Sequence, residues 1–266
     1  MAPRETMTDA MTAPRFQGDP PTHFFSRILE DAGLPHLFTT RNFPGVTAFR
    51  EPFPPLGAEA QPLLARHGLA ALPAAFLKQV HGSRVLEAAE GGCAGNADVL
   101  ITGKPGLPIA VFSADCVPLL IYDPDARRLA VVHAGWRGTA QSAARAAVDA
   151  LVAAGSRSEG LLAAVGPSIG PCCYEVDKPV VARLDAAFPG RWGAWVRSAG
   201  AGKWMLDLWA ANEAQLQDAG LSGDRIDNPR ICTGCRTDLF YSYRRGHNGR
   251  LVSIAAIPLG SPAAAC

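Results

Sequence analysis

The sequence has little net charge and no long apolar segment. Its 25 basic and 24 acidic side chains leave a formal net charge of +1, which does not favour a nucleic-acid or acidic-membrane partner. The longest apolar stretch, LPIAVFSADCVPLLIY, contains Ser113 and Asp115 and is shorter than the ~20 residues that cross a bilayer. The N-terminal residues lack the apolar core of ~7 to 15 residues that a secretory signal requires. We therefore expect a soluble, cytoplasmic protein that binds neither nucleic acid nor membranes.

Histidine and spaced pairs of cysteine are also scarce. Six histidines are too few for the usual cluster of a multicopper oxidase. Seven cysteines are an odd number in a chain that is long enough to bury an ordinary core, which favours reduced thiols or metal ligands over a disulfide framework. Cys232 and Cys235 form a C-x-x-C motif, but Cys172 and Cys173 are adjacent and lack the usual ligand spacing. We interpret both pairs as structural.

The composition, with 48% hydrophobic and 18% charged residues, is that of a globular protein. Residues 1–22 mix charges with prolines and are expected to form a disordered tail, followed by a single domain over residues 23–266. Short apolar runs bounded by turn residues predict strands over residues 106–113, 117–123, 128–134, 161–166 and 251–257. A Pro/Asp turn separates the second and third runs, which predicts a hairpin and a mixed sheet.

Two segments have helical periodicity. Residues 138–155 place alanine, valine and leucine on one face, with Gly155 just past the end. Residues 207–220 begin with Asp207 as an N-cap and end at Gly220.

Three apolar runs each deliver one metal-ligand side chain at or near a strand end: His81, Cys116 and His133. Two imidazoles and one thiolate suit zinc and leave a fourth tetrahedral position open for water or substrate. The spacings of 35 and 17 residues match no short-range zinc motif, so the fold has to bring the three together. The alternative is that they are ordinary core residues, because buried histidine and cysteine are common without a metal.

Six blocks carry a family resemblance: KQVHG, ADVLIT, SADCVPLLIYDP, VVHAGWRGT, GPSIGPCCYEV and CTGCRTDLFYSYRRG. In this order, over about residues 76–255, they resemble the signature blocks of the YfiH-like laccase-domain family. Members have been labelled polyphenol oxidases, peptidoglycan editing factors and purine nucleoside phosphorylases. The resemblance implies an α+β fold, a layered sandwich of mixed β-sheets flanked by helices in a four-layer αββα arrangement. It also implies a catalytic zinc on His81, Cys116 and His133, with copper as the alternative metal.

The activity that the resemblance implies is zinc-dependent purine nucleoside phosphorolysis. Adenosine, inosine or methylthioadenosine would react with inorganic phosphate to give the free base and ribose 1-phosphate, with adenosine deamination as a second activity. The partners would be the nucleoside and phosphate, and the protein a monomer or small homo-oligomer. Alternatives are a copper-loaded polyphenol oxidase, a domain with a structural metal, and an amidase acting on peptidoglycan precursors, in which Cys116 is a nucleophile paired with His133 or His81.

Several further residues are assigned to this chemistry. Asp115 adjoins Cys116 and is expected to transfer a proton or orient a ligand, with a solvated turn residue as the alternative. Arg137 follows the turn after His133, where Gly135 and Gly138 give the backbone freedom, and is expected to contact phosphate. Gln79, in the KQVHG block, is assigned to substrate binding.

The segment FYSYRRG is interpreted as an alternating strand. Phe240, Ser242 and Arg244 then share one face, and Phe240 and Arg244 are assigned to purine stacking and phosphate binding. A packed aromatic strand with a solvated basic end is the alternative.

The segment before these blocks departs from the family pattern. Members usually carry a Thr-Arg-x-Gly-Gly stretch, whereas this chain keeps Thr40 and Arg41 but has Phe43 and Pro44 in place of the glycines. Arg41 is carried over as a substrate-binding residue. The stiffer loop is expected to alter substrate selection.

Overall fold

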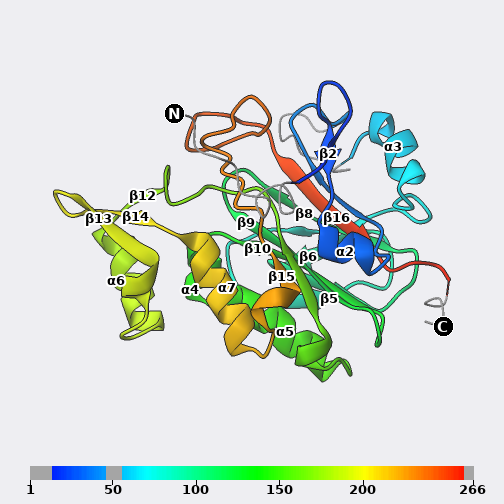
Figure 1. The fold of residues 1–266 in the computed structure, drawn as a ribbon. Coiled ribbons are helices and arrows are strands. Elements are labelled where there is room, and N and C mark those ends of the chain that lie inside the picture. Colours follow the sequence, from blue (N-terminus) through cyan, green and yellow to red (C-terminus); the bar gives the residue numbers. More distant parts are fainter. Residues whose placement is uncertain (1–13, 46–55, 261–266) are drawn as a thin grey trace, which may run out of the picture.

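The computed structural model describes residues 14–45 and 56–260. Two large β-sheets lie face to face, with helices on their outer sides (Figure 1). Among the described residues, none of the helices combines the length and the apolar character needed to span a bilayer.

The larger sheet has seven strands in the order β1-β2-β3-β16-β8-β4-β6. Strand β4 is parallel to both of its neighbours, and the other adjacent pairs are antiparallel. The strands are β1 (Phe16–Gln17), β2 (His23–Phe24), β3 (His36–Thr39), β4 (Ala75–Lys78), β6 (Gly92–Asn96), β8 (Pro108–Ser113) and β16 (Leu251–Ala256).

The second sheet has six strands in the order β15-β11-β9-β10-β7-β5. Its centre is the predicted hairpin of β9 and β10, whose residues pair from Arg128 with Asp123 to Ala134 with Val117. The strands are β5 (Val85–Glu87), β7 (Val99–Thr102), β9 (Val117–Asp123), β10 (Arg128–Ala134), β11 (Leu162–Val165) and β15 (Ile226–Asp227). A small third sheet contains β12 (Glu175–Asp177), β14 (Lys203–Leu206) and β13 (Val196–Gly200).

The helices are short and lie mainly outside the sheets. The α-helices are α2 (Arg27–Asp31), α3 (Gln61–Arg66), α4 (Trp136–Ala140), α5 (Ala143–Ala153), α6 (Lys178–Ala187) and α7 (Leu208–Asp218). The 3₁₀ helices are η1 (Ala58–Ala60), η2 (Ser158–Gly160), η3 (Trp192–Trp195) and η4 (Gly223–Arg225).

The alternation of side chains along the strands divides the core into layers. Ile109 and Val111 of β8 pack between the two sheets, whereas Ala110 and Phe112 belong to a cluster on the outer face with Leu64 of α3. The other face of the six-stranded sheet packs against α5, α6 and α7. This mixed, layered fold confirms the expected α+β sandwich flanked by helices.

All five strands predicted from the apolar runs are present, and so is the helix after Asp207. The carboxylate of Asp207 accepts the Ala210 N–H at 2.9 Å, as an N-cap does. The helix predicted over residues 138–155 is wrong as a single element. It is divided into α4 and α5 because Ser142 adopts φ 60, outside the right-handed helical region.

Two further expectations concern the N-terminal tail and residues 240–246. Residues 1–13 of the expected tail lie outside the described residues, but Phe16 and Gln17 pair with β2, and the Phe16 ring lies 5.3 Å from that of Phe24. The strand expected at residues 240–246 is wrong: this segment forms turns, with the Arg245 N–H donating to the Ser242 carbonyl at 3.2 Å.

Candidate metal centre

Several strand ends meet at one edge of the two sheets and carry the predicted ligands there. The parallel strands β4 and β8 end at Lys78 and Ser113, just before His81 and Cys116. The start of β9 lies beside the end of β10, because Val117 pairs with Ala134. Cys116 and His133 are therefore neighbours although 17 residues separate them.

His81, Cys116 and His133 form a compact group of potential metal ligands. One ligand atom from each lies within 4.8 Å of the others, and the two imidazole rings are 4.9 Å apart between centroids. His133 is buried, Cys116 is half-buried and His81 is exposed. The group thus has one side in the protein and one side toward solvent, as a metal centre that receives a substrate requires.

Asp98, which precedes β7, holds both histidines. Its Oδ1 atom accepts hydrogen bonds from Nδ1 of His133 at 2.8 Å and from the backbone N–H of His81 at 3.0 Å. Its Oδ2 atom accepts from the N–H groups of Gly82 and Val80 at 2.6 and 3.2 Å. These bonds hold a loop in which His81 has the unfavourable φ of 61. They also leave Nε2 of His133 for a metal, the arrangement that orients histidine ligands.

The charges at the centre favour an ionised thiol. Burial raises the pKa of Cys116, but the charges of His133 and His81 and their hydrogen bonds outweigh burial and lower the pKa to about 6. Burial lowers the pKa of His133, but the charge of Cys116 and the hydrogen bond to Asp98 raise it to about 9. In the metal-free protein a thiolate therefore lies beside an imidazolium, and a bound cation would displace the imidazolium proton.

Gly135 keeps the space beside the thiol open. A Cβ atom at this position would lie 2.7 Å from Sγ of Cys116 and 3.2 Å from Nδ1 of His81. Both distances are shorter than van der Waals contact. The cradle that glycine leaves, the oriented imidazole and the mixed nitrogen and sulfur donors fit one zinc ion, for which His81, Cys116 and His133 would be the protein ligands.

The centre opens into a cleft of about 670 Å³, a volume typical of small-molecule sites. The cleft is lined by the three candidate ligands together with basic and aromatic side chains from strands, a helix and loops. Among the latter are Lys78, Arg137, Arg244, Arg250, Phe112, Trp136, Tyr174 and Tyr243. The basic groups suit an anion and the rings suit a flat apolar group.

Two predicted arginines lie in this cleft, each next to an aromatic ring. The guanidinium of Arg137 lies 4.4 Å from the centroid of Trp136, and that of Arg244 lies 5.2 Å from Tyr174. Arg244 also donates through Nη1 to the Glu175 carbonyl at 2.9 Å. Arg244 is therefore held by the wall of the cleft, whereas the ring contact of Arg137 leaves its N–H groups more available to a ligand.

Asp115 lines the cleft, but its carboxylate is already engaged. Oδ1 accepts a hydrogen bond from the Thr233 hydroxyl at 2.6 Å, and Oδ2 accepts one from the backbone N–H of Arg244 at 2.7 Å. Asp98, rather than Asp115, accepts the hydrogen bond from Nδ1 of His133. Asp115 instead joins the turn before Cys116 to two loops of the cleft wall, at the strained φ of 88.

Three predicted substrate residues have other contacts. The amide of Gln79 bonds to both backbone groups of Phe112, at 2.7 and 2.8 Å, and so links β4 to β8 at the edge of the cleft. Phe240 is wrongly placed in the pocket, since its ring is fully buried between the sheets. Arg41 is not among the described residues that line the cleft; it donates to the Thr237 carbonyl at 2.7 Å and lies 5.0 Å from the Tyr241 centroid.

Three residues without a role predicted from the sequence complete the site. Asp98 stands in the ADVLIT block, where an acidic residue just before a buried strand was a usable signal. Tyr174 and Tyr243 lie in two other blocks. Tyr243 is 72% exposed and reaches the cleft although the expected strand would have placed it on the face opposite to Arg244.

The sequence matches the model of the family described as "Multi-copper polyphenol oxidoreductase laccase" over residues 58–258. The chain belongs to this laccase family. It is 39% identical over 238 residues, 85% of this chain and 90% of the relative, to a purine nucleoside phosphorylase of Deinococcus radiodurans. It is also 39% identical over 148 residues, 56% of each chain, to the adenosine deaminase RL5 of an unknown prokaryotic organism. These findings confirm the family and agree with the activities that its sequence blocks implied.

Solved structures of the laccase family share the fold. YlmD from Geobacillus stearothermophilus superposes with a TM-score of 0.79 at 28% sequence identity, covering 91% of this chain and 98% of that one. The family description names several coppers, yet of the six histidines only His81 and His133 are in a ligand group among the described residues. This centre therefore fits a single ion better than a multicopper cluster.

Proposed function

We propose that this laccase-family protein is a purine nucleoside phosphorylase whose centre holds zinc on His81, Cys116 and His133. The observation that carries the proposal is the convergence of these ligand atoms, within 4.8 Å, in a cleft that also contains Arg137 and Arg244. The relatives named purine nucleoside phosphorylase support the same reaction.

Phosphorolysis requires a cleft that binds phosphate and stabilises the departing base. A phosphate oxygen forms a bond to the anomeric carbon of the ribose while the bond to the base nitrogen breaks, and the base leaves with that electron pair and takes up a proton. Arg137, which lines the cleft, would bind the phosphate through its N–H groups. A zinc ion held by His81, Cys116 and His133 would supply a Lewis acid for the negative charge that develops on the departing base.

The chain's own residues orient these components. Asp98 holds His133 and the His81 loop, so the donor set is ready before the substrate arrives. Tyr174 and Tyr243 line the cleft and offer aromatic faces to a purine. The pKa of Tyr174 is raised by burial and by the negative charges of Cys116 and Asp115, so it stays a neutral hydrogen-bonding phenol.

Adenosine deamination at the same centre is the second activity that we propose. Water adds to the purine ring and ammonia leaves, so the product is inosine and phosphate is not consumed. The relative named adenosine deaminase supports this activity. The two reactions are separated by their products and by their phosphate requirement.

One observation favours a second candidate function, a cysteine-dependent amidase. Cys116 and His133 form a thiolate–imidazolium pair, and Asp98 accepts the Nδ1 hydrogen bond of His133. This order of groups is that of a nucleophilic cysteine with an oriented base. The amidase predicts turnover that survives chelation and is lost on alkylation of Cys116.

The deciding experiment is chromatographic product analysis of adenosine incubated with metal-quantified protein, with and without phosphate. Wild type is expected to release adenine only when phosphate is present, and the Cys116→Ala variant none. The matched control is Cys93→Ala, an exposed cysteine on β6 that should leave turnover unchanged. Protein that retains zinc at this centre but releases no base would contradict the phosphorylase, and hydrolysis of an amide substrate after chelation would favour the amidase.

A further inference from the structure

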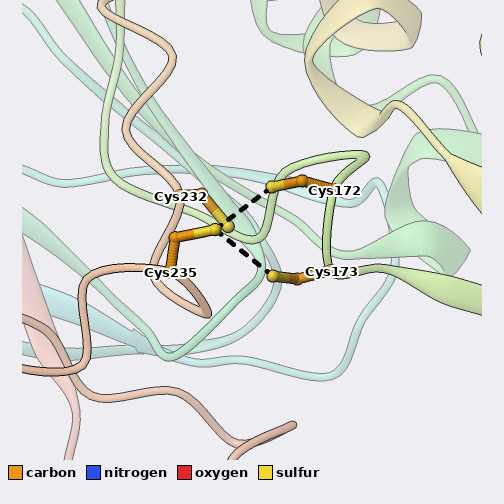
Figure 2. A group of neighbouring side chains, drawn as sticks. All are labelled: Cys172, Cys173, Cys232 and Cys235. Carbon is orange, nitrogen blue, oxygen red and sulfur yellow. Dashed lines mark hydrogen bonds between the residues drawn. The ribbon is translucent and has the colours of Figure 1, made fainter.

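Four cysteines outside the cleft gather in a second group. Cys172 and Cys173 lie in the turn that follows β11, and Cys232 and Cys235 lie in the loop that follows β15 (Figure 2). All four Sγ atoms lie within 4.8 Å of one another. Cys235 is 3.4 Å from the Sγ atoms of both Cys172 and Cys173, and the four side chains point toward one another in Figure 2.

The spacing of the sulfurs distinguishes a metal site from a disulfide. A zinc ion with four thiolates at ~2.3 Å places the sulfurs ~3.8 Å apart, whereas a disulfide bond measures ~2.05 Å. The contacts of 3.4 Å and the limit of 4.8 Å bracket the zinc geometry. One thiol, Cys235, is equally near both residues of the adjacent pair, which favours a shared central ion over one preferred partner.

Backbone and basic groups provide hydrogen bonds to these sulfurs. The Gly170 N–H donates to Sγ of Cys232 at 3.2 Å, and the guanidinium of Arg245 donates to Sγ of Cys173 at 3.3 Å. Such donors stabilise thiolates that bind a metal. Arg230 and Arg236 line the same surface hollow as Cys172, Cys232 and Cys235. Both of these arginines are ion-paired with carboxylates. The guanidinium of Arg245, which donates to Cys173, would therefore offset part of the net charge of −2 that a divalent ion with four thiolates carries.

The backbone between the paired cysteines leaves room for this close approach. A Cβ atom at position 234 would lie 2.9 Å from Cβ and 3.2 Å from Sγ of Cys173, so Gly234 lets the two loops meet. The Cys235 and Arg236 N–H groups donate to the Cys232 carbonyl at 3.2 and 3.0 Å and form a tight turn. A turn of this kind directs both thiols of a C-x-x-C motif to one point.

We infer that Cys172, Cys173, Cys232 and Cys235 bind a second, structural zinc ion, separate from the centre in the cleft. Neither pair holds the ion alone, because the four ligands come from two loops about 60 residues apart. Four thiolates complete the tetrahedral coordination of zinc and leave no position for water or substrate, as in structural zinc sites. The inference does not depend on which reaction the cleft catalyses.

The position of this four-cysteine site indicates what the ion would stabilise. Thr233, between two of the ligands, bonds to Asp115, and Arg245 donates to both the Gly234 carbonyl and Cys173. The neighbouring residues Tyr174 and Arg244 line the cleft. The zinc would therefore fasten together two loops that form the cleft wall.

Elemental analysis of purified protein tests the inference directly. Wild type is expected to contain about two zinc ions per chain, and Cys232→Ser/Cys235→Ser about one. Cys116→Ala should also contain about one, now held by the four cysteines. Cys93→Ser is the control, because this exposed thiol belongs to neither group among the described residues and should leave both ions in place.

Thiol accessibility provides a second readout that does not require a folded double variant. In native wild type the exposed Cys172 and Cys235 should resist a thiol reagent until a strong chelator is added, whereas the exposed Cys93 should react at once. The Cys172→Ser variant, with three ligands left, should release zinc at least tenfold faster to a chelator. Zinc-free Cys116→Ala protein, iron in place of zinc, immediate reaction of all exposed thiols, or a Cys172–Cys235 disulfide in unreduced protein would each overturn the inference.

Discussion

Oδ1 of Asp98 lies 2.8 Å from Nδ1 of His133, and both side chains are almost completely buried. Burial raises the pKa of Asp98, but the hydrogen bonds from His133, Gly82 and His81 outweigh it and lower the pKa. The carboxylate is therefore ionised and acts as a fixed acceptor. Through it, the orientation of His133 and the conformation of the His81 loop depend on one residue.

Replacing Asp98 by Asn should weaken metal binding at the cleft. The amide preserves the shape of the side chain but removes its negative charge. It also introduces an NH₂ group that cannot accept the hydrogen bonds donated by His133, His81 and Gly82. Loss of such a partner typically costs roughly 10–100-fold in metal affinity. Competition with a chromophoric chelator measures the change, with Asp149→Asn on the exposed face of α5 as the control. Wild-type affinity in Asp98→Asn would show that Asp98 does not position the ligands.

Gly135→Ala should obstruct the metal centre without unfolding the protein. The added methyl would lie 2.7 Å from Sγ of Cys116, so either the Cys116 side chain or the start of α4 must shift. Overpacking of about 1–3 kcal/mol corresponds to roughly 5–150-fold weaker zinc binding. Gly160→Ala is the control, because a Cβ there meets nothing within 4 Å. Equal zinc affinity in both variants would contradict the crowding described for Gly135.

Arg137→Ala should raise the KM for phosphate and change kcat less. A lost hydrogen bond to a charged group costs about 1.5–3 kcal/mol, or roughly 10–100-fold in affinity. Steady-state kinetics at varied phosphate concentration measures the effect. Arg145→Ala, on the exposed face of α5, should behave as wild type. An unchanged KM for phosphate would place the anion elsewhere in the cleft.

The pH dependence of stability should depend on His36. This side chain donates from Nδ1 to the Leu34 carbonyl at 2.8 Å, and its Nε2 accepts from the Ser26 N–H at 2.8 Å. Burial lowers its pKa from 6.5 to about 4, because the charged imidazolium would be removed from water. Between these pH values the unfolded state binds more protons at His36, so the contribution of His36 to stability falls as the pH decreases from 6.5 to about 4 and is constant below.

The matching experiment compares wild type with His36→Gln by denaturant unfolding at several pH values. The neutral variant lacks this titration, so its stability difference from wild type should narrow by about 3 kcal/mol over this interval. A difference that stays constant with pH would show that His36 does not titrate with a lowered pKa.

The strands and the layered fold were predictable because each buried strand is a continuous apolar run with turn residues at its ends. The break between α4 and α5 was not, since it depends on the backbone of Ser142 and not on the periodicity of the flanking alanines. The alternation in residues 240–246 resembled a strand, but Ser242 bonds within its own turn and Phe240 fills the space between the sheets.

The site was predictable only where a ligand stands near a strand end. His81, Cys116 and His133 carry that signal, whereas the contact of Asp98 with His133 depends on the pairing of β7 with β10. The four-cysteine site was hidden for a similar reason. Adjacent Cys172 and Cys173 have no ligand spacing of their own, and their partners lie about 60 residues away in another loop.

The most direct test of the proposed phosphorolysis is ³¹P NMR of wild type with adenosine and inorganic phosphate, with free base measured in the same samples. We expect ribose 1-phosphate in an amount equal to that of the free bases together, adenine and any hypoxanthine that follows deamination, and neither sugar phosphate nor free base with Cys116→Ala. Conversion of adenosine to inosine with no sugar phosphate formed, or no conversion by protein with zinc at His81, Cys116 and His133, would contradict the phosphorylase.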